Sequence, residues 1–447
     1  MMSRARLPRL WLWLPLALAP LLSGPAVQVS GARILAAVPM RSASHFRVLQ
    51  PLLRALAHRG HHLTVISHFP QQPPPPNYTD ISLNSAATHG RAPSPYMGNP
   101  DHPAYMENFF LSMVAPLGFW ERTANSAFYL LMRLANWWLS ERVIDEVERA
   151  ALGSALPPTS RLVYNTSLML LNSHFSLNQP IPLVPAMIEV GGLHIEQPKP
   201  LPKELQEFFD SSEHGVVYFS MGTMLRVDAL PQEQLRGILR AFASLPQKVL
   251  WKADHTLLPP LPPNVHTSEW LPQNDILNHP KTVAFVTHGG MLGLQEAVAA
   301  GVPMLVVPVL GDQPHNAASL SSRGVALTLT VNQLTEHNVR HALDSLVNDT
   351  SYRKRMKQLS ALFRDRPRPP LEEAVYWVEY VIRHRGAPHL RSAALDLAWY
   401  QYLLLDVAAL VLATVLLALA SVYAGLRWIL GPLLVGNRAQ RKKIKSN

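Results

Sequence analysis

The sequence contains no cysteine among its 447 residues. This absence excludes disulfide bonds, thiol catalysis and zinc sites built from thiolates. Charged residues are also scarce, at 16%, whereas 48% of the residues are hydrophobic. A folded body must therefore be stabilised mainly by burial of apolar side chains. No internal repeat of solenoid period is visible, which argues against a repeat architecture.

The first 32 residues have the pattern of a secretory signal peptide. Three arginines within the first nine residues precede an apolar stretch around residues 10–22, and small residues follow up to Ala32. We therefore predict that residues 1–32 direct the chain into the secretory pathway and are removed near Ala32.

A second apolar segment lies near the carboxyl end. Residues 407–426 carry no charge and are long enough to span a bilayer as a helix, although a buried helix of a soluble protein would read similarly. A basic tail without acidic residues follows, and positive charge marks the cytoplasmic side of a membrane. We predict one span, a lumenal body and a cytosolic tail.

Two lysines of this tail have a specific placement. Lys443 and Lys445 occupy the fifth and third positions from the carboxyl end, which resembles the dilysine retrieval signal of endoplasmic-reticulum membrane proteins. The alternative is that they only supply the cytosolic positive charge. The resemblance implies location in the endoplasmic-reticulum membrane.

The formal net charge of +10 comes mostly from the two ends of the chain. Eight positive charges and no acids lie in the predicted signal and tail, so the remainder carries only +2. The basic balance therefore reflects membrane topology, and we predict no nucleic-acid partner. The sequons at Asn77, Asn165 and Asn348 are consistent with a lumenal glycoprotein.

Short apolar runs alternate with helical stretches, which predicts an α/β protein with parallel sheets. In the carboxyl-terminal half we predict strands at residues 216–220, 248–251, 283–287, 304–307 and 326–330. In the amino-terminal half we predict a strand at 33–39, a helix at 44–59, a strand at 62–67 and a Pro-rich loop at 71–78.

The turn after the strand at 283–287 has the most specific pattern of the chain. His288-Gly289-Gly290 ends the strand, and a helix is predicted up to residue 300. The two glycines permit a tight turn and a close approach to a ligand. The free amides at the start of the helix favour an anionic group such as a diphosphate.

Further polar residues are directed to the same edge of the predicted sheet. Glu296 lies one to two turns into the helix, and the next strand leads to Asp312 and Gln313. Open α/β sheets bind ligands at the carboxyl ends of their strands. Taken singly, Glu296 could be a solvated helix residue and Asp312 part of a turn before Pro314.

The segment 285–313 resembles the signature of the UDP-glycosyltransferase family in its animal, membrane-anchored branch. The resemblance extends to residues 218–223, 270–273 and 399–406. It implies a GT-B fold with two Rossmann-like α/β domains and a carboxyl-terminal transmembrane helix. The implied organisation is a signal peptide at 1–32, an acceptor-binding domain at 33–190, a UDP-sugar-binding domain at 191–365, a bracing helix and juxtamembrane segment at 366–400, a transmembrane helix at 403–427 and a cytosolic tail at 428–447.

The resemblance also implies roles for single residues in the donor site. Trp270 stacks on uracil, Gln273 and the Leu271 backbone hold the base edge, and Asp312 and Gln313 hold sugar hydroxyls; a buried core position is the alternative for Trp270. The other implied donor-binding residues are Ser220, Gly222, Thr223, His288, Gly289, Gly290, Gly293 and Glu296. Gly293 departs from the pattern, since many members have a hydroxyl residue there. The UDP-sugar is a co-substrate, and the scheme requires neither a metal nor a cofactor.

A histidine near the amino terminus matches the catalytic position of the family. His45 follows the first predicted strand, and the resemblance implies that it takes the proton from the acceptor hydroxyl. Without the resemblance, a lone histidine at a helix start is more often a solvated cap residue.

The resemblance is interrupted after Asp80. Family members continue with further strands and helices, which include an aspartate that orients the catalytic histidine. Here the chain passes to a stretch that resembles a much later part of those sequences, so we predict that several dozen residues are missing near 80–90 and that the amino-terminal domain is incomplete. Asp80 and Asp101 are predicted in loops and Asp145 in a charged helix, and none is a convincing partner for His45.

We therefore predict an enzyme that transfers a sugar from a UDP-sugar to the hydroxyl of a small lipophilic acceptor with inversion, as relatives do in detoxification. The alternative is a catalytically impaired short form that binds UDP-sugar, or that pairs with full-length relatives as a homo- or hetero-oligomer. The sequence leaves the acceptor open because the missing block, together with helices predicted within residues 106–148, would have shaped its pocket.

Overall fold

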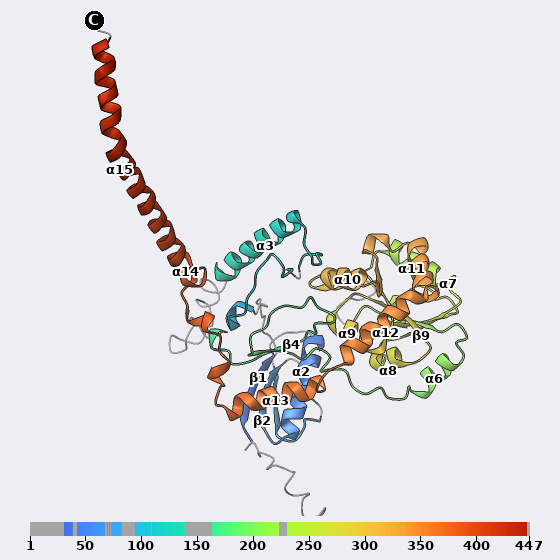
Figure 1. The fold of residues 1–447 in the computed structure, drawn as a ribbon. Helices are drawn as coiled ribbons and strands as arrows, with labels where there is room; N and C mark the ends of the chain where they lie inside the picture. Colours follow the sequence, from blue (N-terminus) through green and yellow to red (C-terminus); the bar gives the residue numbers. More distant parts are fainter. Residues whose placement is uncertain are drawn as a thin grey trace, which may run out of the picture.

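The computed structural model describes residues 31–38, 43–67, 69, 71, 73–82, 94–108, 110–138, 146, 163–222 and 230–444. These residues form two α/β lobes and one long helix that projects away from them (Figure 1). The predicted signal peptide up to residue 30, Thr223, Asp145 and Lys445 lie outside the described residues.

The first lobe contains a parallel sheet of the order β1-β2-β3. The strands are β1 (Arg33–Val38), β2 (His62–Ser67) and β3 (Tyr78–Ser82), and helix α2 (Ala43–His58) connects the first two. Buried side chains of α2, including Phe46 and Leu53, pack with Leu63 and Val65 of β2 in one core cluster. The predicted strand at 62–67 and the helix after β1 are confirmed.

Strand β3 corrects the sequence-based prediction for Asp80, which was placed in a loop. Tyr78 and Ile81 favour a strand, and Tyr78 is buried in the core of the lobe. The Gln71 side chain donates to the Tyr78 hydroxyl at 2.8 Å, and the Gln71 backbone amide donates to Asp80 Oδ2 at 2.9 Å. These contacts of the preceding loop help to hold the strand.

Strand β1 lies at one edge of this sheet, where β2 is its only partner among the described residues. The side chain of Leu35 is 67% exposed. Parallel sheets are normally covered on both faces and paired at their central strands. Within the described residues of the first lobe, one side of this apolar strand is therefore unpaired.

The second lobe contains a six-stranded parallel sheet of the order β11-β10-β9-β6-β7-β8. Its strands are β6 (Val216–Ser220), β7 (Lys248–Lys252), β8 (Val265–Ser268), β9 (Thr282–Thr287), β10 (Met304–Val306) and β11 (Ala326–Thr328). Its helices are α6 (Lys203–Asp210), α7 (Gln232–Ala243), α8 (Gln273–Asn278), α9 (Met291–Ala300), α10 (Gln313–Ser322), α11 (Glu336–Asn348) and α12 (Thr350–Arg364). Five of these strands were predicted. β8 was not, because only Val265 of its four residues is both apolar and buried.

Both faces of this sheet are buried. In β6, Tyr218 stacks on Phe285 on one face at 5.1 Å between ring centroids. The next residue, Phe219, points to the other face and stacks on Trp251 at 4.7 Å. Successive side chains of a strand point to opposite faces, so a strand covered on both sides is apolar throughout. The continuous apolar runs in the sequence reflect this double burial.

A short parallel pair, β4 (Met169–Leu171) and β5 (Met187–Glu189), precedes the second lobe along the chain. Gln295 of α9 ties the segments after these strands to the second lobe. Its side chain accepts from the Gly192 amide at 3.0 Å and donates to the Asn172 carbonyl at 3.2 Å. Because Gln295 is fully buried, these bonds replace the water that its amide would otherwise bind.

Helix α13 (Pro370–Arg383) crosses back to the first lobe and lies beside α2, as expected for the bracing helix (Figure 1). Glu379 of α13 is buried and accepts two hydrogen bonds from the Arg59 guanidinium, one of them at 2.9 Å. His61 Nε2 lies 3.4 Å from the same carboxylate. This pairing connects the end of α2 to a helix more than 300 residues later.

Replacing Arg59 with alanine should lower the free energy of unfolding by about 2–3 kcal/mol, because the buried Glu379 carboxylate loses its main partner. This loss is smaller than that expected for a fully buried ion pair, because the Arg59 side chain is half-exposed. Arg340→Ala removes an exposed pair with Asp344 and should cost less than about 1 kcal/mol. Thermal unfolding of the purified full chain in detergent measures both. Equal effects would mean that the brace adds no more than a surface pair.

The same carboxylate gives the brace a pH dependence. Burial alone would raise the pKa of Glu379, but the hydrogen bond and charge of Arg59, together with His61, outweigh it and lower the pKa. A depressed carboxyl pKa in the folded state contributes stability above the unfolded value of about 4.3, and this contribution is lost as the pH falls through the folded value.

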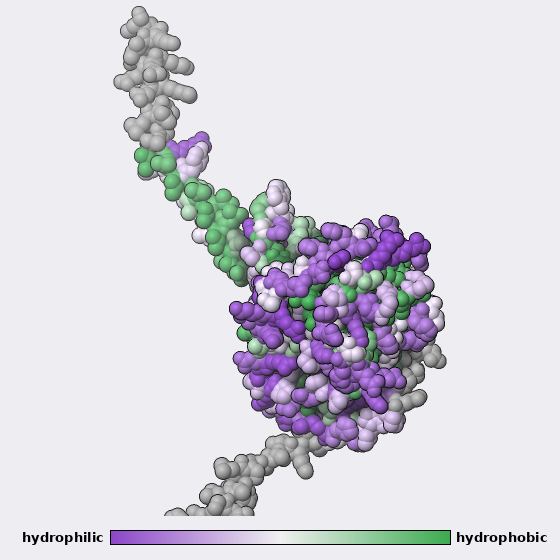
Figure 2. Space-filling model, turned by 90° about the vertical axis from the view of Figure 1, so that its right-hand side faces the viewer, coloured by the Kyte–Doolittle hydropathy of each residue, from purple (hydrophilic) through white to green (hydrophobic). Residues whose placement is uncertain are grey.

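After α13 come two 3-10 turns, Pro388–Leu390 and Ala393–Asp396, then α14 (Trp399–Tyr402) and α15 (Leu405–Ile444). Residues Leu405–Ile429 of α15 are long and apolar enough to cross a membrane, and none of the most apolar window is buried (Figure 2). Helix α15 begins at Leu405, two residues after the predicted start of the transmembrane helix at 403, and the positive φ of 54° at Leu404 separates it from α14.

Candidate functional site

The turn between β9 and α9 has the geometry of an anion site. Gly289 has a φ of +88°, and a Cβ there would lie 2.8 Å from the Val306 side chain. Gly290 is the N-cap of α9, and in the described part of the chain no side-chain hydrogen bond caps this helix. The first amides of α9 are thus left for an external acceptor, and helix N-termini favour negative charge.

The imidazole of His288 fills the space between two glycines. A Cβ at Gly222 would lie 2.6 Å from His288 Cε1, and a Cβ at Gly290 would lie 2.6 Å from Nε2. Burial lowers the pKa of His288; the nearby Asp312 charge opposes this effect and Lys252 adds to it. Its buried Nδ1 has no hydrogen-bond partner in the described part of the chain. His288 is therefore neutral near pH 7.

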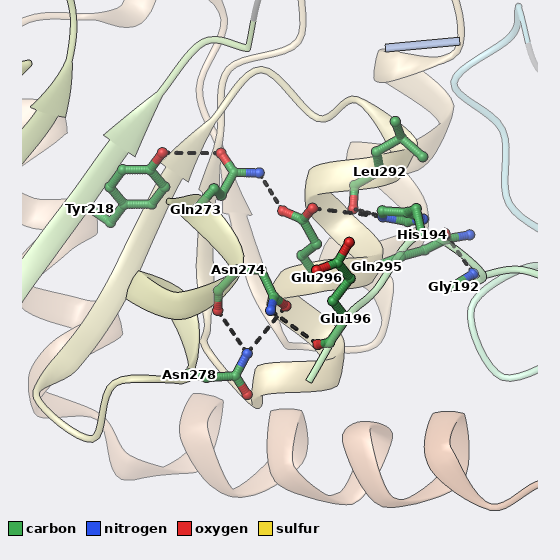
Figure 3. Close-up of polar contacts among 10 residues, drawn as sticks. All are labelled: Gly192, His194, Glu196, Tyr218, Gln273, Asn274, Asn278, Leu292, Gln295 and Glu296. Atoms are coloured by element: carbon green, nitrogen blue, oxygen red, sulfur yellow. Dashed lines mark hydrogen bonds and ion pairs between the residues drawn. The ribbon is translucent and has the colours of Figure 1, made fainter. Parts of the chain in front are cut away.

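A hydrogen-bonded chain connects α9 to the central strand of the sheet (Figure 3). The Tyr218 hydroxyl donates to Gln273 Oε1 at 3.1 Å, and Gln273 Nε2 donates to Glu296 Oε2 at 2.5 Å. His194 Nε2 donates to the Leu292 carbonyl and lies 3.8 Å from Glu296 Oε1. Burial lowers the pKa of His194 to about 4, so this histidine is neutral beside Glu296.

Two cations lie beside Trp270 and influence Glu296. The Trp270 side chain is 60% exposed, so it is not the core residue that its chemistry also allowed. The Arg47 guanidinium, from α2 of the first lobe, lies 4.8 Å from the indole centroid, and Lys252 Nζ lies 5.4 Å from it. Burial raises the pKa of Glu296, while the Gln273 hydrogen bond and the charges of Arg47 and Lys252 partly oppose the rise.

The loop before α10 joins the turn after β9 through one amide. Asn316 Nδ2 donates to the Gly289 carbonyl at 3.0 Å and to Asp312 Oδ2 at 2.9 Å. Gln313 Oε1 accepts from the amides of Val309 and Leu310, which fixes the loop. Asp312 is thereby held beside the glycine turn.

The structure brings most of the predicted donor residues to one end of the second sheet. Ser220 is buried at the end of β6, and its Oγ accepts from the Gly222 amide at 3.3 Å. Gly293 lies on α9, where a Cβ would approach Gln273 Nε2 to 3.3 Å. The Leu271 side chain is buried in the core.

The remaining predicted residues are described only in part. His45 lies in the first turn of α2, and Lys443 lies in the last turn of α15, but the positions of their side chains are outside the described set, as is Thr223 entirely. The placement of His45 within a helix that follows β1 agrees with the sequence prediction.

Four residues of this site were not singled out from the sequence. Arg47, Lys252, His194 and Asn316 all contact or influence the predicted residues. Only Asn316 carried a local signal, because it follows Asp312 by four positions and so shares its helix face. The other three reach the site through tertiary structure.

Comparisons of the chain with protein families, with relatives and with solved structures show what it is similar to. A family model described as UDP-glucoronosyl and UDP-glucosyl transferase matches residues 82–433. The chain is 37% identical to "UDP-glucosyltransferase 2" of Dactylopius coccus, covering 86% of this chain and 90% of that protein. It is 41% identical to "UDP-glucuronosyltransferase 1A8" of Homo sapiens, covering 70% of this chain and 58% of that protein.

Among solved structures, that of UDP-glucose: anthocyanidin 3-O-glucosyltransferase in complex with UDP aligns with a TM-score of 0.54 at 16% identity. The match covers 79% of this chain and 99% of that chain, and it shows the GT-B fold.

The alignment with the Dactylopius coccus protein has more positions than the number of residues of this chain that it includes. It extends over 467 positions, whereas 86% of 447 residues is about 384, so about 80 positions have no residue in this chain. The matched share of the relative is nevertheless 90%, and the family model matches more than half of the chain. The chain therefore belongs to the family of UDP-glucuronosyl and UDP-glucosyl transferases, which transfer sugar from a UDP-sugar to an acceptor.

Proposed function

We propose that this UDP-glycosyltransferase moves the sugar to the hydroxyl of a small lipophilic acceptor, with inversion at the anomeric carbon and His45 as general base. The observation that carries the proposal is the contact between Arg47 and Trp270. Arg47 lies only two residues after His45, so the first turn of α2 lies against the predicted donor site.

The donor fits the polar groups of the second lobe. The exposed face of Trp270 suits a uracil ring, and the Glu296 carboxylate suits ribose hydroxyls. The uncapped amides of α9 suit the diphosphate. Asp312 and the Nε2 group of Gln313 are proposed for the sugar, since Gln313 Oε1 accepts from the amides of Val309 and Leu310. Arg47 must leave the indole face, or share it, when uracil binds.

The chemistry is a single displacement. His45 accepts the acceptor proton as the acceptor oxygen forms a bond to the anomeric carbon, and the bond from that carbon to the diphosphate oxygen breaks. UDP leaves with the electron pair of the broken bond. Negative charge grows on the diphosphate, where the α9 amides stabilise it in the transition state. Because His288 is neutral, the α9 amides and Lys252 are the groups that stabilise this negative charge.

We further propose that α15 spans the endoplasmic-reticulum membrane, with the two lobes in the lumen and the basic tail in the cytosol. The apolar stretch of α15 and the placement of Lys443 and Lys445 support this orientation.

A second candidate is a short form that binds UDP-sugar without turnover and pairs with full-length relatives. The first sheet favours it, because within the part of the chain that the structure describes it has three strands with β1 unpaired on one side, and Leu35 is mostly exposed. The roughly 80 alignment positions without a residue in this chain point the same way. Of the candidate aspartates, Asp80 accepts from the Gln71 amide and Asp101 from the Tyr129 hydroxyl.

One experiment separates the two candidates. Microsomes that contain the full chain should bind UDP, measured by calorimetry and by protection from thermal unfolding, under both candidates. Glycoside formation from UDP-glucose or UDP-glucuronic acid and a panel of lipophilic alcohols and phenols is expected only under the first. UDP binding without any glycoside would leave the second candidate, and no UDP binding would overturn both.

A further inference from the structure

Helix α3 (Phe119–Trp138) in the first lobe carries its apolar residues on the outside. Its exposed large apolar side chains include Trp120, Leu130, Leu131, Leu134, Trp137 and Trp138, each at least half exposed. At 100° per residue these six positions fall within an arc of about 120°. A helix on the surface of a water-soluble protein normally buries such an apolar face against the core.

The opposite side of α3 is polar and is fixed to residues 101–106 of the segment that precedes the helix. Asn125 is buried, and its side-chain amide donates to the carbonyls of Pro103 at 2.7 Å and Met106 at 2.8 Å. The Tyr129 hydroxyl donates to Asp101 Oδ2 at 2.7 Å. These bonds would be lost if the helix rotated, so its outward apolar arc is set by specific contacts.

The same segment that holds α3 also holds the approach to α15. Gly98, three residues before Asp101, accepts a hydrogen bond from Ser392 Oγ at 3.1 Å. Ser392 lies just before α14, whose residues Trp399 and Tyr400 are exposed. In Figure 1, α3 lies at the same end of the body as α14 and the start of α15. Figure 2 shows hydrophobic surface at this end, where α15 leaves the body.

We propose that α3 lies in the interface of the membrane that α15 spans, with its apolar arc in the outer part of the acyl layer. Amphipathic helices that lie in this interface combine Trp and Leu on one face with basic residues on the other. Arg122 and Arg133 lie to one side of the arc at 100° per residue. Arg133 donates to the Tyr129 hydroxyl at 2.8 Å, yet its side chain is 54% exposed, so it remains accessible to lipid head groups. Because α15 anchors the chain in the bilayer, α3 is held close to the membrane. The apolar arc of α3 is therefore expected to contact lipid and not a second copy of the chain.

The absence of cysteine allows a direct test on the full chain. Single cysteines at Leu131 and Leu134 are labelled with a nitroxide, and the labelled chains are reconstituted in phosphatidylcholine vesicles. Glu204→Cys on exposed α6 is the aqueous control, and Leu417→Cys in α15 is the lipid control. Collision rates with oxygen, which concentrates in lipid, and with a water-soluble nickel complex are measured by power saturation.

The expected result is an oxygen-to-nickel collision ratio at Leu131 and Leu134 several-fold above that at Glu204 and toward that at Leu417. A ratio equal to that of Glu204 would place α3 in water and overturn the proposal. Shielding from both reagents, with spin–spin broadening that disappears on dilution with unlabelled chain, would assign the arc to a second copy and overturn it as well. Circular dichroism of each labelled chain checks that the overall helix content is unchanged by the substitution and the label.

Discussion

His45→Ala is expected to lower the rate of glycoside formation by about 10²–10⁴-fold, while the Kd for UDP stays within about twofold. The large effect follows from the loss of general-base catalysis at the acceptor hydroxyl. The small effect follows because the donor groups come from the second lobe, around α9 and Trp270. Initial rates at saturating UDP-sugar and calorimetric titration with UDP measure the two quantities on the same preparation.

The matched control for this variant is His58→Ala. His58 is an exposed histidine in the last turn of the same helix, at the end away from the donor site, and should affect neither quantity. Activity that survives in His45→Ala would show that another group takes the proton. A parallel loss of UDP binding would show that the substitution disturbs the packing of α2 against the second lobe.

Gly290→Val is expected to raise the Kd for UDP by about 100-fold, equivalent to about 2.7 kcal/mol of binding free energy. A Cβ at this position would lie 2.6 Å from His288 Nε2, so either the imidazole or the first turn of α9 must move and disturb the space beside the α9 amides. That space is where the diphosphate is proposed to bind. Losing one or two hydrogen bonds to a charged group accounts for a change of this size. Calorimetry and the UDP-induced shift in Tm measure it.

Gly425→Val provides the comparison, because a Cβ at Gly425 has no heavy atom within 4 Å. It should leave UDP binding unchanged. The Tm of Gly290→Val without UDP must also be measured, so that a general loss of folding is distinguished from a loss of binding. A Kd for UDP near that of the unchanged chain would remove the glycine turn from the diphosphate site.

The second lobe was largely predictable because its signals are local. Strand β6 was predicted with the bounds that the structure gives, and the turn His288-Gly289-Gly290 with α9 follows from residues next to one another in sequence. The carboxyl ends of parallel strands meet at one edge, so Asp312 could be assigned to the same crevice as Glu296 without knowing a single contact. The structure supports this with Asn316, which bonds both Asp312 and the turn.

The first lobe was less predictable. Strand β3 was read as a loop because it follows a Pro-rich stretch and contains Asp80. These five residues form a strand because they pair with β2 and because Gln71 bonds to Tyr78 and Asp80. Neither contact can be recognised from the five residues alone. Helix α3 was expected only as part of the helical region at residues 106–148. Its outward apolar face depends on Asn125 and Tyr129, which attach the opposite side to the segment before the helix.

The sequence by itself determined the α/β class, the glycine turn at the start of α9 and the apolar stretch of α15, because backbone propensity and hydrophobic periodicity act over a few residues. Only the tertiary structure decided that Arg47 lies on Trp270 and that Glu379 pairs with Arg59. These partners are hundreds of residues apart, and their contact depends on how two lobes and a returning helix pack together. No local pattern encodes that packing, since it is set by the summed burial of side chains from many elements.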